Sequence, residues 1–170
     1  MSTTQWILSI ALLAWALLRN VGTREITRAT YLVPIVLVVV AGGYFLFPLP
    51  TAGNDLDLVV ALGVIGVLFG LAASAVTRLS HRDGRLVATA GAGFASLWLV
   101  MIGGRIVFAE WANGTGARAV GTFSMDHAIT GADAWTAALV VMALGMVLAR
   151  TVALALRARR IQTQPAPAVA

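Results

Sequence analysis

The chain has 170 residues, of which 59% are hydrophobic and only 11% are charged, and its mean hydropathy is +0.89. Because soluble domains carry about 25% charged residues, this composition excludes an ordinary soluble protein and indicates an integral membrane protein. The net charge of +5 comes from arginines next to apolar runs, which favours a role in membrane topology over nucleic-acid binding. The lack of cysteine excludes disulfides, thiolate metal sites and thiol redox chemistry.

Five apolar runs with few or no charged residues predict five transmembrane helices. A helix rises about 1.5 Å per residue, so roughly 20 residues cross a hydrocarbon core of about 30 Å. In chain order, the helices are expected at about residues 3–18, 31–49, 58–77, 86–109 and 134–156. Residues 1–160 form a single transmembrane domain in this interpretation, and residues 161–170 form a disordered cytoplasmic tail.

The first apolar run has a second interpretation, because a short apolar stretch near a start is the usual form of a cleaved signal peptide. No Arg or Lys precedes this run, whereas Arg19, Arg24 and Arg28 follow it. A signal peptide has the opposite order of charges. The run therefore predicts a retained helix whose C-terminal end is cytoplasmic.

The charges of the connections alternate along the chain. The connections after the first and third helices and the C-terminal tail are rich in arginine, whereas those after the second and fourth helices are mainly acidic. By the positive-inside rule, the N-terminus lies outside and the C-terminus in the cytoplasm. The predicted fold is an all-α polytopic transmembrane bundle. A chain with arginine and no lysine, rich in Ala, Gly and Val, is typical of a GC-rich bacterial genome, so the plasma membrane of a bacterium is the expected location.

Small residues recur at spacings of three and four in the third predicted helix. Gly63, Gly66, Gly70 and Ser74 fall on one stripe that includes a GxxxG unit. Such a stripe lets another backbone approach closely. Two alternatives follow, namely packing inside the bundle and contact with a second copy of the chain.

The connection between the third and fourth helices reads RLSHRDGR over residues 78–85. Its Asp83-Gly84 pair is a signal for a two-residue turn. The pattern predicts either a tight turn or a small hairpin with Leu79 and Leu86 against the membrane.

Two arginines fall within predicted helices. Arg105 is expected about 28 Å along the fourth helix, near the outer surface, and Arg150 near the inner one. A long side chain near a helix end can extend to the headgroups, so both arginines have a purely interfacial interpretation. The alternative for either arginine is a buried pair or an anion-contacting site, and for Arg105 the candidate partners are Glu110, Asp126 and Asp133.

The outer segment 110–133 is predicted to be a solvated loop or an interfacial helical piece. It supplies, with Arg105, the candidate functional residues Glu110, Asp126, His127 and Asp133. Their spacing matches no metal motif, and no catalytic or nucleotide-binding motif occurs along the chain. We therefore expect no metal, no cofactor and no catalytic residue.

Several short motifs together resemble a known family. They are an arginine-rich connection before Pro34, the Thr77-Arg78 and Asp83-Gly84 pairs, Trp98 followed by Gly104-Arg105, and a last helix reading LARTVALALRAR from Leu148 to Arg159. The chain resembles the DUF1453 group of small bacterial membrane proteins, which is similar to the CcdC-like proteins. The resemblance implies a multi-pass membrane protein with a name linked to cytochrome c maturation. Without cysteine, any such role is indirect.

Two function classes fit these observations. The first is a non-enzymatic membrane protein that scaffolds or assists a partner, either another membrane protein or a second copy. The second is a small oligomeric transporter or channel subunit in which Arg105 and the outer acidic residues line a path. The lipid bilayer is the expected environment in both cases, and no nucleic acid is expected.

Overall fold

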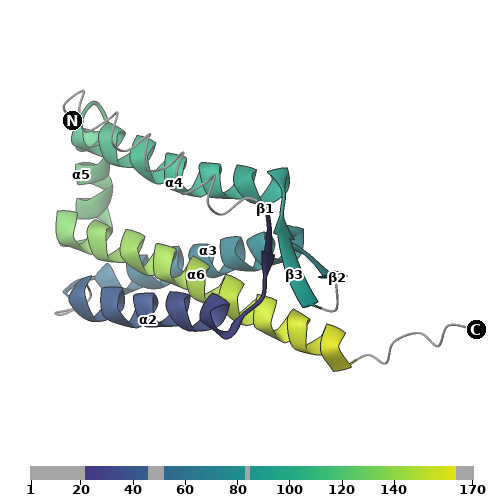
Figure 1. The fold of residues 1–170 in the computed structure, drawn as a ribbon. Helices are drawn as coiled ribbons and strands as arrows, with labels where there is room; N and C mark the ends of the chain where they lie inside the picture. The colour runs from purple at the N-terminus through teal and green to yellow at the C-terminus, as the bar shows by residue number, and fades with distance from the viewer. Residues whose placement is uncertain (1–21, 46–51, 83–84, 164–170) are drawn as a thin grey trace, which may run out of the picture.

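A computed structural model gives the fold, which is described for residues 22–45, 52–82 and 85–163. The elements are β1 (Gly22–Glu25), α2 (Arg28–Phe45), α3 (Asp55–Val76), β2 (Arg78–Arg82), β3 (Arg85–Ala90), α4 (Ala92–Asn113), α5 (Ala117–Asp126) and α6 (Ala132–Thr163). Long helices lie side by side, with the strands at one end and α5 at the other (Figure 1). The predominantly helical class is confirmed.

Three helices are long and apolar enough to cross a membrane, and they run over Asp55–Val76, Ala92–Asn113 and Ala132–Ile161. The apolar part of α2 is shorter and covers Ala29–Tyr44. The prediction of a first helix at 3–18 lies outside the described residues, as does the end of the second at 46–49. The described part of the chain holds five helices, but one of them is the short α5 rather than the predicted first span.

Among the described residues, α6 packs against two of the other long helices. The closest pair is α3 with α6, and α2 packs on α6 while α4 packs on α3. The main buried cluster includes Phe94 and Met101 of α4 and Met142 and Met146 of α6. Many other large apolar side chains are exposed, such as Val39 of α2 at 67%, which is the arrangement expected when lipid rather than water surrounds the helices.

The three strands form an antiparallel sheet in the order β1-β3-β2. Leu79 pairs with Ala88 and Arg82 with Arg85, so β2 and β3 form the hairpin that was one of the two alternatives for this connection. The predicted turn residues Asp83 and Gly84 lie outside the described residues. On the other side of β3, Gly22 pairs with Ala90, and this pairing brings in β1, a strand that the sequence did not predict.

The start of the fourth helix differs from the prediction. The segment Arg85–Ala90 is strand β3, and α4 begins at Ala92 rather than at Leu86. The prediction relied on the absence of charges, which does not distinguish a buried strand from a helix. Val87 and Thr89 are β-branched and favour the strand, and Gly91 separates it from the helix.

The C-terminal part of the chain also differs from the prediction. The last helix was predicted over 134–156, but α6 runs from Ala132 to Thr163 and therefore includes the first residues of the predicted disordered tail. The outer segment contains α5, so it is partly helical rather than an irregular loop. Residues 164–170 lie outside the described residues.

Candidate functional site

The stripe of small residues on α3 faces α6. A Cβ atom built on Gly66 would lie 2.0 Å from the carbonyl oxygen of Met142, and one on Gly70 would lie 2.4 Å from that of Met146. A Cβ atom on Gly63 would lie 3.1 Å from the side chain of Val141, which is a looser contact. The two helices thus approach backbone to backbone along one seam, which we call the α3–α6 seam. Ser74 extends the stripe and is 1% exposed.

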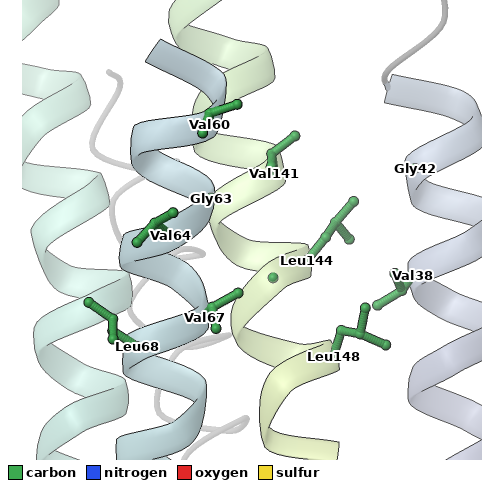
Figure 2. A pocket seen from close by; sticks show the side chains of 11 residues that line it. Val38, Gly42, Val60, Gly63, Val64, Val67, Leu68, Val141, Leu144 and Leu148 are labelled. Atoms are coloured by element: carbon green, nitrogen blue, oxygen red, sulfur yellow. The ribbon is translucent and has the colours of Figure 1, made fainter. Parts of the chain in front are cut away.

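Beside the seam, an apolar groove of about 570 Å³ is lined by residues of α2, α3 and α6. Figure 2 shows Leu144 and Leu148 of α6 extending toward α2, with Val64 and Val67 on the α3 wall. None of its lining residues is ionisable. The groove therefore suits hydrocarbon rather than a polar solute.

Arg105 lies farther inside its helix than predicted. Because α4 begins at Ala92, Arg105 is 13 residues from the sheet end of the helix and 8 from Asn113, or about 20 Å and about 12 Å along the axis. It is half-buried and lines an apolar cavity of about 250 Å³ between α3, α4 and α6, next to Phe108 and Trp135. A side chain at this depth can still extend toward the nearer surface.

The outer candidates do not gather around Arg105. Asp126 and His127 are exposed at the end of α5, and Asp133 is exposed in the first turn of α6. The His127 ring stacks on Phe123 at 4.1 Å, and its Nδ1 lies 2.9 Å from the Phe123 carbonyl oxygen. Across the ranges that the structure describes, no ion pair joins Arg105 to Asp126 or Asp133.

Glu110 is half-buried on α4, five residues beyond Arg105. The described residues contain no group of three or more His, Asp or Glu side chains placed to hold a metal ion. The geometry of this end therefore gives separate polar side chains rather than a convergent site.

A buried carboxylate that the sequence did not single out does lie at this end. Asp55, at the start of α3, is fully buried and accepts hydrogen bonds from the backbone N–H of Thr130, at 2.8 Å, and from its hydroxyl. The Asn54 N–H donates to the Ala128 carbonyl at 3.0 Å. Gly53 has a φ of +55°, and any Cβ there would overlap the Ala128 carbonyl. These contacts fasten the α5–α6 connection to α3, and nothing local in the sequence connects segments so far apart.

A polar pocket of about 610 Å³ lies at the opposite end, where the sheet meets α2 and α6. Its wall includes Arg24 of β1, Thr30 of α2, and Arg150 and Thr151 of α6. Its wall is more polar than that of the groove beside the seam or of the cavity next to Arg105. The sequence had placed Arg150 near the inner surface and left open a buried pair or an anion-contacting site for it.

Arg150 and Arg157 occupy two different environments on α6. The guanidinium carbon of Arg150 lies 4.4 Å from the centre of the Phe94 ring, and its buried Nε has no hydrogen-bond partner among the described residues. Arg157 instead donates to the Ser74 carbonyl in the last turn of α3. An arginine that completes the end of a neighbouring helix has a structural role as well as a topological one.

The arginines at the sheet end and the acidic residues at the α5 end make the two ends of the bundle electrostatically different.

A family model described as "DUF1453: CcdC protein" matches residues 1–164. The chain belongs to the DUF1453 family. The resemblance seen in its short motifs is confirmed over nearly the whole chain.

No curated protein and no solved structure matches this DUF1453 member. Its family membership and its candidate spans agree with a membrane protein. The arguments about its function therefore rest on the side chains and packing described above.

Proposed function

We propose that this DUF1453 member is a non-enzymatic accessory protein of the bacterial plasma membrane, which crosses the bilayer five times with its N-terminus outside and its C-terminus in the cytoplasm. The α3–α6 seam is the observation that supports the proposal best. At Gly66 and Gly70 the two helices leave no room even for a methyl group, so the middle of this pair is dry and closed.

The other intramembrane spaces support the same proposal. The groove beside α2 has no ionisable residue in its wall, and the cavity next to Arg105 is otherwise lined almost entirely by apolar side chains. A path for ions or polar solutes requires polar groups along its length. A protein with a closed seam and apolar grooves acts more readily through contacts with other membrane components.

The charge distribution supports the orientation. The sheet end carries arginines on β1, β2 and β3 as well as at the end of α6, and the acidic residues Asp55, Asp57 and Asp133 lie at the α5 end. The positive-inside rule places the arginine-rich end in the cytoplasm.

The second candidate is a small oligomeric transporter or channel subunit, and the depth of Arg105 is the observation that favours it. A charged residue within a membrane helix is often part of a transport path. In that case Arg105 and the outer acids Glu110, Asp126 and Asp133 would act together. Double-variant cycles of Arg105→Gln with neutralised acids would then show coupling in stability.

Flux measurements on purified protein in proteoliposomes separate the two candidates. For an accessory protein we expect chloride, phosphate and monovalent cations to leak no faster than from protein-free vesicles. The Arg105→Gln variant should leave this baseline unchanged. Saturable flux through the wild-type protein that disappears in Arg105→Gln would refute the accessory role and establish a transport path.

A further inference from the structure

The polar pocket at the sheet end has the features of a binding site, and it lies at the level where helices begin and end. It is bounded by the first turn of α2, by Thr77 just after α3, and by the face of the sheet that carries Arg24 and Ala88. Since α3 is long enough to span a membrane and ends at Val76, the pocket lies near a membrane surface.

The pocket is electropositive. Arg150 lies in its wall and is held against Phe94, which is 1% exposed. Within the described ranges, no carboxylate pairs with it. Glu25, the acid in the pocket wall, is engaged by Arg85, whose Nη1 donates to both of its oxygens at 2.9 and 3.0 Å. A cation fixed in a partly desolvated position without an anion favours an anionic ligand.

The start of α2 adds to this field. Ala29 and Thr30 of its first turn line the pocket. The first N–H groups of an α-helix lack partners within the helix, and its N-terminus carries a partial positive charge. In α2 the Thr30 N–H donates to the Thr27 carbonyl at 3.0 Å, so the contribution of this turn is the potential of the helix end and the N–H groups before Thr30. Helix N-termini bind phosphate groups for this reason. The helix and Arg150 are independent sources of positive potential, and both are in the wall of one pocket.

The pocket also has an apolar side. Val33, Pro34 and Leu154 complete its wall. From Val33, which is 61% exposed, an apolar face continues along α2 through Val36 and Val40, at 57% and 65% exposed. A ligand with a phosphate at one end and a hydrocarbon chain at the other would match both parts.

We propose that this pocket binds the phosphate of an anionic phospholipid, with the headgroup between Arg150 and the first turn of α2 and an acyl chain along the exposed face of that helix. Guanidinium groups bind phosphate by charge-assisted and often bidentate hydrogen bonds. The site is a specific lipid site and differs from the diffuse attraction of surface arginines to an anionic leaflet.

Native mass spectrometry of the full chain in detergent tests the proposal, with phosphatidylglycerol titrated as the probe. We expect saturable binding of phosphatidylglycerol and weaker binding of phosphatidylcholine. Arg150→Gln should weaken phosphatidylglycerol binding by about tenfold or more, since the charge-assisted hydrogen bond to the phosphate is lost. Arg82→Gln, which removes the same charge from exposed β2, should bind as the wild type does.

A second variant keeps the test valid if Arg150→Gln fails to fold. Ala29 is exposed in the first turn of α2, so Ala29→Phe should leave the fold intact and fill the pocket, and binding should fall while the charge is unchanged. Equal binding by the wild type and Ala29→Phe would overturn the proposal, as would equal losses in Arg150→Gln and Arg82→Gln. Displacement of the lipid by millimolar inorganic phosphate would also overturn it and identify a site for free phosphate.

Discussion

The α3–α6 seam leads to a sharp prediction for Gly66→Ala. The new Cβ would lie 2.0 Å from the Met142 carbonyl oxygen, and an ordinary contact begins at 3.4 Å, so the helices must separate by about 1.4 Å. The three nearest atoms all belong to the backbone of Met142, which cannot rotate away. Overpacking of this kind typically destabilises by about 1–3 kcal/mol, and we expect the upper part of this range because the shift also loosens the contact at Gly70.

Gly103→Ala on α4 is the matched control. No heavy atom of the described residues lies within 4 Å of the position of its added Cβ. The same chemical change should therefore stabilise the protein slightly, since alanine is favoured over glycine in helices by about 0.8–1 kcal/mol. The free energy of unfolding, measured by SDS titration with circular dichroism, should thus fall in Gly66→Ala and rise in Gly103→Ala. A Gly66→Ala protein as stable as the wild type would refute the tight seam. Val67→Leu, at a position that is 41% exposed, should have only a mild effect on stability.

Three further predictions concern the topology and two side-chain contacts. A cysteine at exposed Thr115 should react with an impermeant thiol reagent in intact cells and one at exposed Ser80 should not, while the reverse pattern would invert the proposed topology. Asp55→Asn should lower the free energy of unfolding by about 1.5–3 kcal/mol because it weakens two hydrogen bonds to a buried carboxylate. The control Asp57→Asn, at an exposed position, should be near neutral, and equal effects of the two substitutions would refute the anchoring role of Asp55. Arg157→Gln should destabilise the protein by about 1 kcal/mol or more because the hydrogen bond to the end of α3 is lost. Arg157→Lys should retain part of this stability. Unchanged thermal unfolding of both variants would show that the contact contributes nothing to stability.

Within the described residues, the sequence predicted the four long helices because long apolar runs have few other stable forms in a membrane. It predicted the ends less well, since hydropathy alone does not separate Arg85–Ala90, a strand, from the helix after it. The strand Gly22–Glu25 has no apolar alternation at all, and its four residues are all exposed. It exists because its backbone pairs with β3, and such a pairing between distant segments leaves no local pattern.

The candidate sites illustrate the same limit. The spacing of Gly66 and Gly70 predicted a close approach of two backbones, but only the fold identifies Met142 and Met146 on α6 as the partners. The polar pocket depends on residues from β1, α2, β3 and α6, which are far apart along the chain. Arg105 stood out in the sequence because a charge in an apolar run is conspicuous, whereas Asp55 did not, because an acid in a connection is ordinary.

The three-stranded sheet ties together the start of α2, the end of α3 and the start of α4 (Figure 1). Single membrane helices adjust to a thicker or thinner bilayer by sliding or tilting independently. Here the hydrogen-bonded register of the strands links the ends of three helices, so in the proposed transmembrane arrangement we expect none of them to slide along the membrane normal alone. A mismatch in thickness would then be met by tilting the linked helices together or by deforming the surrounding lipid.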